Sequence, residues 1–412
     1  MIYYYALLAF PLATIGLPLY IYLPTFYATN VGIDIALVGI ILFIARISDV
    51  FTDPLLGVLS DKCLKKYNSR KPFMIVGAFL LVVSFYFLIN PNLEYKSYWL
   101  FFFSVLIYFA WSMISIPYLT WSSELSTNYY EKTKLNSFRE VSTILGLLLA
   151  LVAPYFASSD KIEDKLNILF MVFFFVFVIF FLISMIKITP QQKALNNTFN
   201  LKDIKEVYKK IPQLKTLQLG YFFNNLANAI PATLFLLFIE TVIKKEENSS
   251  EVLILYFLSG VLALPLWTLL SKKIGKKNVW IASILLASSS FIFVVFLEEN
   301  DLLLFAIISI VSGLSLGADI AFPTAIQADL TQKIKTINDN ISGLVFGIWT
   351  MITKISLALS IAISFGILGL VDFDKQNLTT TSLLTITLLY GLVPVVLKII
   401  SIFIIFKYNE EN

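Results

Sequence analysis

Residues 46–54 read Arg-Ile-Ser-Asp-Val-Phe-Thr-Asp-Pro, and they lie inside an otherwise apolar segment that runs from Ile35 to Leu59. On a helix, Arg46, Asp49 and Asp53 are spaced i, i+3 and i+7, so one face carries all three. A charge in hydrocarbon is costly and usually faces an internal cavity on an ion or substrate path. If all three groups are ionised, about one negative charge is uncompensated. A monovalent cation or a proton would balance that charge.

The composition around this stretch is that of an integral membrane protein. Of 412 residues, 58% are hydrophobic and only 14% are charged, and the mean hydropathy is +0.82. Apolar stretches of about 20 residues recur from end to end, each long enough for a helical span. We therefore predict an all-α membrane protein with about twelve spans. The predicted spans are residues 6–28, 35–60, 73–92, 98–122, 138–157, 165–188, 214–243, 251–271, 278–297, 302–328, 341–370 and 381–407.

The charged loops alternate in sign along the chain. Lysine and arginine follow spans two, six and eight, whereas the opposite loops are mainly acidic. The positive-inside rule then places both termini in the cytoplasm, and it assigns the basic residues to topology rather than to a nucleic-acid partner. Short loops favour the inner membrane of a bacterium. Without histidine and with Cys63 as the lone cysteine, Cys/His metal sites are excluded, and no cofactor other than a coupling ion is predicted.

A polar connector divides the spans into two groups of six. We predict an N-terminal bundle at 1–188, a cytoplasmic linker at 189–213 and a C-terminal bundle at 214–412. Pro54 and Pro117 have counterparts at Pro265 and Pro323, at similar separations along the chain. Parallel six-helix repeats with a site at their interface are the architecture of major facilitator transporters. The charges of residues 46–53 have no counterpart near Phe257, which favours a cation site confined to the first half.

Several motifs resemble the glycoside–pentoside–hexuronide:cation symporters, the melibiose-permease-like branch of the major facilitator superfamily. The most specific is residues 45–57, followed by Asp61 and a basic turn. Similar pieces recur later in the chain, at Ile116-Pro117-Tyr118, Ala328-Asp329 and Thr350-Met351 with Lys354. The resemblance implies a symporter that works by alternating access, coupled to Na⁺ or H⁺, with a small sugar-like solute as its cargo.

The resemblance also implies roles for individual residues. Asp49 and Asp53 would bind the coupling cation, a span-four hydroxyl at Ser112 would assist, and Thr52 stands where the family varies its cation selectivity. Lys354 would couple the cation and substrate sites, and Arg139 resembles the substrate-side arginine. Asp61 and Arg70 resemble a salt-bridge latch that stabilises one access state, although a plain topology signal is an equal alternative.

This chain departs from the family pattern at the sugar site. Residues 10–27 contain no acid, and Ser115 stands where melibiose-type carriers have a second aspartate. A lysolipid or another amphiphile is therefore an alternative cargo. Four further polar residues are candidates for the cavity: Asn224, Asn225, Asn228 and Asp319. Amides in hydrocarbon need partners, either a polar substrate or neighbouring helices. Asp319 would pair with Lys354 or meet the substrate.

Other interpretations of the buried charges remain open. Asp49, Asp53, Arg46 and Lys354 could form a purely structural network, in which loss of one member leaves a buried charge uncompensated. A nucleotide-binding Gly-x-x-x-x-Gly-Lys-[Ser/Thr] pattern is absent, so ATP-driven transport is disfavoured. A membrane enzyme or a sensor is a remote alternative. We expect no catalytic residues, a small-molecule substrate, the lipid bilayer as surroundings, and function as a monomer.

Overall fold

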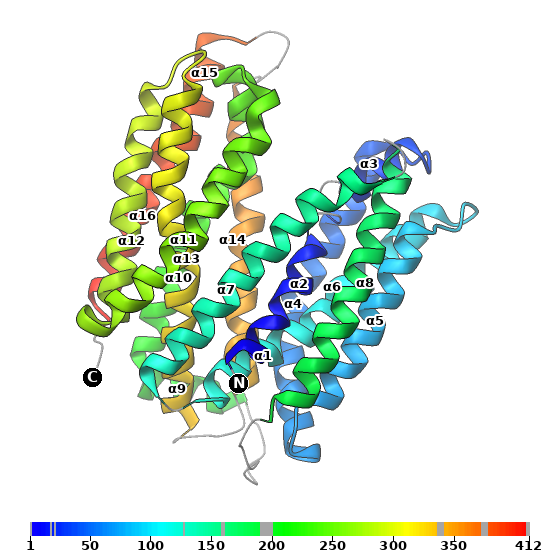
Figure 1. Ribbon diagram of the computed structural model, residues 1–412, viewed down its shortest axis with the longest axis vertical. Helices are drawn as coiled ribbons and strands as arrows, with labels where there is room; N and C mark the ends of the chain where they lie inside the picture. Colours follow the sequence, from blue (N-terminus) through cyan, green and yellow to red (C-terminus); the bar gives the residue numbers. More distant parts are fainter. Residues whose placement is uncertain are drawn as a thin grey trace. The chain divides into compact units, whose positions relative to one another are not determined.

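The computed structural model describes residues 2–16, 19, 22–126, 128–157, 161–189, 201–335, 342–371 and 378–408, and most of these residues are helical (Figure 1). The first half contains α1 (Ile2–Leu7), α2 (Ala9–Thr14), α3 (Leu23–Thr29), α4 (Ile35–Tyr67), α5 (Lys71–Ile89), α6 (Lys96–Glu124), α7 (Tyr129–Val152), α8 (Ile162–Lys187) and α9 (Leu201–Lys210). The second half contains α10 (Pro212–Phe238), α11 (Ser249–Ile274), α12 (Lys276–Phe291), α13 (Leu302–Lys335), α14 (Ser342–Leu370), α15 (Thr380–Thr387) and α16 (Val393–Phe406).

The helices confirm the predicted all-α membrane architecture. In the described part of the chain, 10 helices are long and apolar enough to cross a membrane. The expected second span is α4, a continuous helix of 33 residues that carries the three charges. The described residues of the expected first span include the short helices α1, α2 and α3. Together these elements account for the roughly twelve spans that the apolar stretches indicate.

The chain forms two compact units. Unit 1 comprises Met1–Asp203 and Thr331–Met351, and unit 2 comprises Ile204–Leu330 and Ile352–Asn412. The core of unit 1 is strongly aromatic: the ring of Phe85 on α5 lies 5.5 Å, centroid to centroid, from that of Phe173 on α8. The predicted bundle boundaries remain predictions. Residues 190–200 of the predicted linker lie outside the described residues, and α9 occupies much of the remainder.

Glycines bring α14 close to α4 within unit 1. A Cβ atom added at Gly343 would lie 2.6 Å from the carbonyl oxygen of Gly57, and one added at Gly347 would lie 2.6 Å from that of Asp53. These two α14 glycines are four residues apart, the spacing at which small residues let membrane helices approach closely. The backbone around Asp53 is therefore held against a second helix.

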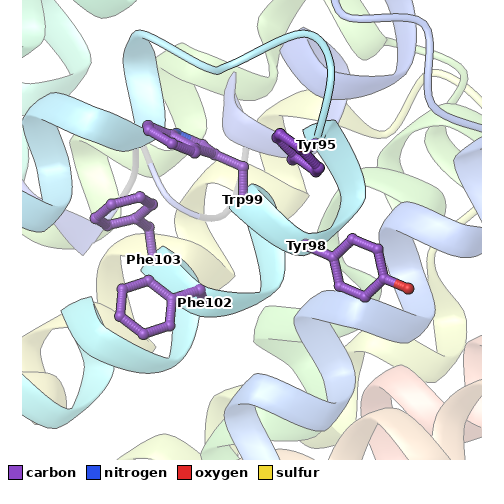
Figure 2. A pocket seen from close by; sticks show the side chains of 5 residues that line it. All are labelled: Tyr95, Tyr98, Trp99, Phe102 and Phe103. Atoms are coloured by element: carbon purple, nitrogen blue, oxygen red, sulfur yellow. The ribbon is translucent and has the colours of Figure 1, made fainter.

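The first turns of α6 carry an open aromatic pocket (Figure 2). It is lined by Tyr95, Tyr98, Trp99, Phe102 and Phe103. The indole Nε1 of Trp99 donates to the Phe87 carbonyl oxygen at 2.7 Å, while the side chain of Tyr98 points outward and is 79% exposed. Tyrosine and tryptophan gather at the membrane–water interface, where a polar tip meets water and a ring meets lipid. The pocket fits such a belt.

Candidate functional site

The two carboxylates of α4 are buried within unit 1. Asp49 is 3% exposed and Asp53 is 0% exposed. The Ser112 hydroxyl of α6, itself buried, donates to Oδ1 of Asp49 at 3.1 Å. The structure therefore brings together the predicted aspartate and the predicted span-four hydroxyl, from two helices packed side by side. Carboxylate and hydroxyl oxygens are the ligand type that hard cations prefer.

Two other predicted residues lie on the same helices but are less buried. The Thr52 hydroxyl donates to the backbone carbonyl oxygen of Asp49 at 3.1 Å, so its hydrogen bond stays within α4. A threonine bonded in this way keeps oxygen lone pairs for another partner. Ser115 is half-buried on α6, three residues beyond Ser112. Their roles in cation selectivity and in the substrate cavity stay predictions.

Arg46 contacts an aromatic ring that the sequence did not single out. Its guanidinium carbon lies 4.7 Å from the centroid of Tyr108, a buried residue of α6. This is within the distance of an attractive cation–π contact. Tyr108 precedes Ser112 by one helical turn, so the same face of α6 contacts both Arg46 and Asp49 of α4.

Asp61 and Arg70 form the predicted ion pair, with additional partners. Nη2 of Arg70 lies 2.7 Å from Oδ1 of Asp61, and Nε of Arg70 donates to Oε1 of Glu124 at 3.1 Å. Both carboxylate oxygens of Asp61 also accept from the first turn of α14, from the backbone N–H of Gly343 at 2.8 Å and of Leu344 at 3.0 Å. An acid at a helix N-terminus satisfies free N–H groups and complements the helix dipole.

Arg139 is buried near the start of α7 and is paired with its neighbour in the sequence. Its Nε donates to Oε1 of Glu140 at 2.9 Å, and Nη2 contacts the same oxygen. Tyr5 and Tyr118 lie nearby, and the Tyr118 hydroxyl donates to the Tyr5 carbonyl oxygen at 2.7 Å. Because Glu140 is paired with it, Arg139 presents a smaller net positive charge to a substrate than a lone arginine would. The substrate role of Arg139 stays a prediction.

Asp319 lies at the centre of a buried polar cluster in unit 2. Nζ of Lys398 on α16 lies 2.8 Å from Oδ2 of Asp319, and Ser283 on α12 donates to Oδ1 at 3.0 Å. Nδ2 of Asn228 donates to the same carboxylate at 3.3 Å, and Oδ1 of Asn224 accepts from Lys398 at 3.1 Å. The two asparagines, one turn apart on α10, therefore have partners on neighbouring helices. Partners on neighbouring helices were one of the alternatives predicted for these asparagines, whereas Lys398 was not predicted.

Asn225 and Lys354 are placed separately from this cluster. Nδ2 of Asn225 donates to the carbonyl oxygen of Thr353 at 3.3 Å, and the Tyr221 hydroxyl lies 2.8 Å from the Thr353 hydroxyl. These contacts join α10 to α14 just before Lys354, which is half-buried. The predicted coupling of Lys354 to the cation site stays a prediction.

Sequence reasoning missed three contributing residues, for different reasons. Lys398 is a lone charge in an apolar span, which is the same signal that revealed Arg46. Glu124 ends α6, where an acid looks like an ordinary interfacial residue. Tyr108 gave no signal, because 15% of the chain is aromatic. Over the described residues, no group of three or more His, Cys, Asp or Glu is placed to hold a metal ion.

A many-helix membrane protein with carboxylates buried in one unit has the features of an ion-coupled secondary transporter. The chain belongs to the MFS/sugar transport protein family, whose model matches residues 4–411. Its fold is that of the major facilitator superfamily. The E. coli fucose:proton symporter superposes with a TM-score of 0.71, over 99% of this chain and 98% of that chain, at 13% identity.

Curated relatives include several symporters. The sodium-dependent lysophosphatidylcholine symporter 1 of Homo sapiens is 22% identical over 91% of this chain and 77% of its own length. An uncharacterized symporter of Synechocystis sp. is 35% identical, but the match spans 31% of this chain and 25% of that protein. The relatedness is therefore to major facilitator symporters in general, and it is not specific to the melibiose-permease-like branch.

Proposed function

We propose that the protein is a sodium-coupled symporter that works by alternating access, with its cation site at Asp49 and Asp53. The observation that carries the proposal is the burial of both carboxylates on one helix, with the Ser112 hydroxyl on Asp49. The sodium dependence named for the human relative supports Na⁺ as the coupling ion rather than H⁺. The protein would act as a monomer in a bacterial inner membrane with both termini in the cytoplasm.

The charges around the site suggest how coupling would work. Binding of one monovalent cation beside Asp49 and Asp53 would stabilise their buried carboxylates and lower the cost of keeping them inside the protein. Lys354 and Arg139 would transmit that change to the substrate cavity. Asp61, bound to both Arg70 and the first turn of α14, would act as the latch of one access state. Release of the latch would break charge-assisted hydrogen bonds, which makes the switch between states a discrete step.

Two classes of cargo compete. The first expected span has no acid to hold sugar hydroxyls, and the long alignment with a lysophosphatidylcholine symporter favours an amphiphile with a charged headgroup. The description of the family favours a sugar or glycoside. We place the amphiphile first, because a hydroxyl-rich cargo would need free polar partners, whereas Arg139, Asn224, Asn228 and Asp319 already have partners within the protein.

Transport in proteoliposomes tests the function. Vesicles that contain the purified protein are given an inward sodium gradient, and the uptake of a labelled lysophospholipid is compared with that of a labelled glycoside. We expect lysophospholipid uptake to require sodium and to be abolished by Asp49→Asn and Asp53→Asn. Asp34→Asn is the matched control, because Asp34 is an exposed carboxylate at the start of α4. Uptake of either cargo without a sodium requirement, under a proton gradient alone, would refute sodium coupling.

A further inference from the structure

The contact between Arg46 and Tyr108 raises a question of charge balance at the cation site. Arg46 and Asp49 are three residues apart on α4, within reach of each other along one helix face. A guanidinium that closes onto a carboxylate forms two strong hydrogen bonds and cancels its charge. Such a pair would compete directly with a sodium ion for the oxygens of Asp49. The affinity of the site therefore depends on where the guanidinium is held.

The ring of Tyr108 offers the guanidinium a second partner. It lies 4.7 Å from the guanidinium carbon and is only 4% exposed, so little water weakens the attraction. The negative face of the Tyr108 ring attracts the guanidinium through the quadrupole of the ring. Because the ring carries no net charge, it does not neutralise the charge of Arg46.

Register along the two helices strengthens this assignment. Tyr108 and Ser112 are one turn apart on α6, and they meet Arg46 and Asp49, which are nearly one turn apart on α4. The residue numbers rise in the same direction on both helices, so α4 and α6 run parallel. The two contacts are therefore neighbours along one helix–helix interface. On one face of α6, the ring of Tyr108 therefore holds the guanidinium of Arg46, and the hydroxyl of Ser112 orients the carboxylate of Asp49.

We propose that Tyr108 is a positioning residue of the cation site, whose ring holds the guanidinium of Arg46 and so sets the sodium affinity of Asp49. This inference rests on the proposed sodium site and adds a residue that sets the affinity of that site for sodium. Tyr108 acts through Arg46 and not as a ligand of the ion. Its effect must therefore vanish when Arg46 is absent.

A double-mutant cycle tests this dependence. The sodium concentration that gives half-maximal thermal stabilisation is measured for the wild type, Tyr108→Leu, Arg46→Gln and the double variant. We expect Tyr108→Leu to weaken sodium binding by about tenfold in the Arg46 background and to change it little in the Arg46→Gln background. Tyr108→Phe keeps the ring and should stay within about twofold of the wild type. Phe103→Leu, another aromatic of α6, is the control and should leave sodium binding unchanged.

The possible outcomes distinguish a failure of this inference from a failure of the proposed function. Equal weakening by Tyr108→Leu in both backgrounds, or no weakening, would show that the ring only packs and would overturn the inference while the sodium site stands. A wild type that sodium does not stabilise would refute the proposed function, and the inference with it. If Tyr108→Leu does not fold, phenylalanine analogues of increasing fluorination at position 108 replace it. Their sodium affinity must fall as the ring quadrupole weakens, and a constant affinity would overturn the inference.

Discussion

Asp49, Asp53 and Ser112 show at the scale of single residues why an acid in an apolar helix is informative. An ionised carboxylate in hydrocarbon is so unfavourable that its presence requires a partner, and the sequence alone exposes that requirement. The partner itself is harder to predict. Ser112 was assigned only through a family resemblance, and nothing distinguishes Tyr108 in a chain so rich in aromatic residues. The acids of α4 were predictable from their energetic cost, whereas the residues that contact them could not be predicted from the residues alone.

Ser112→Ala tests the hydroxyl at this site. The change removes a neutral oxygen and the hydrogen bond that orients Asp49. Hydrogen bonds to charged groups contribute about 1.5–3 kcal/mol, so we expect sodium binding to weaken by about tenfold. Sodium-dependent thermal stabilisation measures the affinity. Ser104→Ala, at another buried serine of α6, provides the control. An unchanged sodium affinity in Ser112→Ala would exclude the hydroxyl from the site.

At the scale of elements, helix lengths followed from the apolar stretches, but two features did not. In the described part of the first expected span, α1 and α2 are separate short helices that meet at Leu8, where one continuous helix was expected. The helix α9 lies in a stretch interpreted as a polar linker, although Ile204, Val207, Tyr208 and Ile211 recur at helical spacing. That short amphipathic pattern was a usable signal, obscured by the surrounding lysines.

The close contact between α4 and α14 makes a prediction about glycine. An added methyl group at Gly343 would lie 2.6 Å from the Gly57 carbonyl oxygen and 2.7 Å from Oδ1 of Asp61. Since backbone cannot move away cheaply, we expect Gly343→Ala to destabilise the protein by about 1–3 kcal/mol. Gly366→Ala is the control on the same helix, where no atom lies within 4 Å. Unfolding temperatures in detergent compare the two, and equal values would mean that the helices do not touch at Gly343.

The docking of α9 predicts a dependence on alkaline pH. The Tyr208 hydroxyl donates to Oε1 of Gln218 at 2.5 Å, and burial raises the pKa of Tyr208 above its usual value. The folded state therefore favours the neutral phenol. Its stabilising contribution is complete below the ordinary tyrosine pKa of about 10 and is lost as the pH rises through the higher folded pKa.

Tyr208→Phe removes this titration. Between about pH 8 and about pH 11, the wild type should lose more thermal stability than the variant, because only the wild type must keep a phenol neutral at this site. All other lysines and tyrosines titrate equally in both proteins, so the difference between them isolates Tyr208. A constant difference across the pH range would contradict the assigned burial of its hydroxyl.

At the scale of the whole molecule, the two halves share a buried ion pair in corresponding places. Arg70, just before α5, binds Glu124 at the end of α6, and Lys276 at the start of α12 binds Asp329 near the end of α13. This agrees with the repeat that the prolines indicated. The charged centres differ, however, because unit 1 buries two acids near Arg46 on the single helix α4, whereas unit 2 pairs Asp319 of α13 with Lys398 of α16. The repeat could be predicted from the sequence. The difference in charge between the halves was predicted only for α4, because Lys398 was missed.

This difference predicts separate roles for the two centres. Lys398→Met would leave Asp319 buried without its cation, and we expect a loss of about 3–5 kcal/mol in stability with the sodium-dependent stabilisation preserved. Asp49→Asn should do the reverse, retaining the basal unfolding temperature and losing the response to sodium. Thermal unfolding with and without sodium measures both quantities. A sodium response lost in Lys398→Met, in protein that is still folded, would assign unit 2 a part in cation binding.

Equilibrium binding of radioactive sodium to the purified protein tests the central claim most directly. We predict saturable binding to the wild type and to Asp34→Asn, with binding abolished in Asp49→Asn and in Asp53→Asn while all four proteins remain folded. If the wild type shows no saturable binding, or if the two α4 variants bind sodium as well as it does, Asp49 and Asp53 do not form a sodium site.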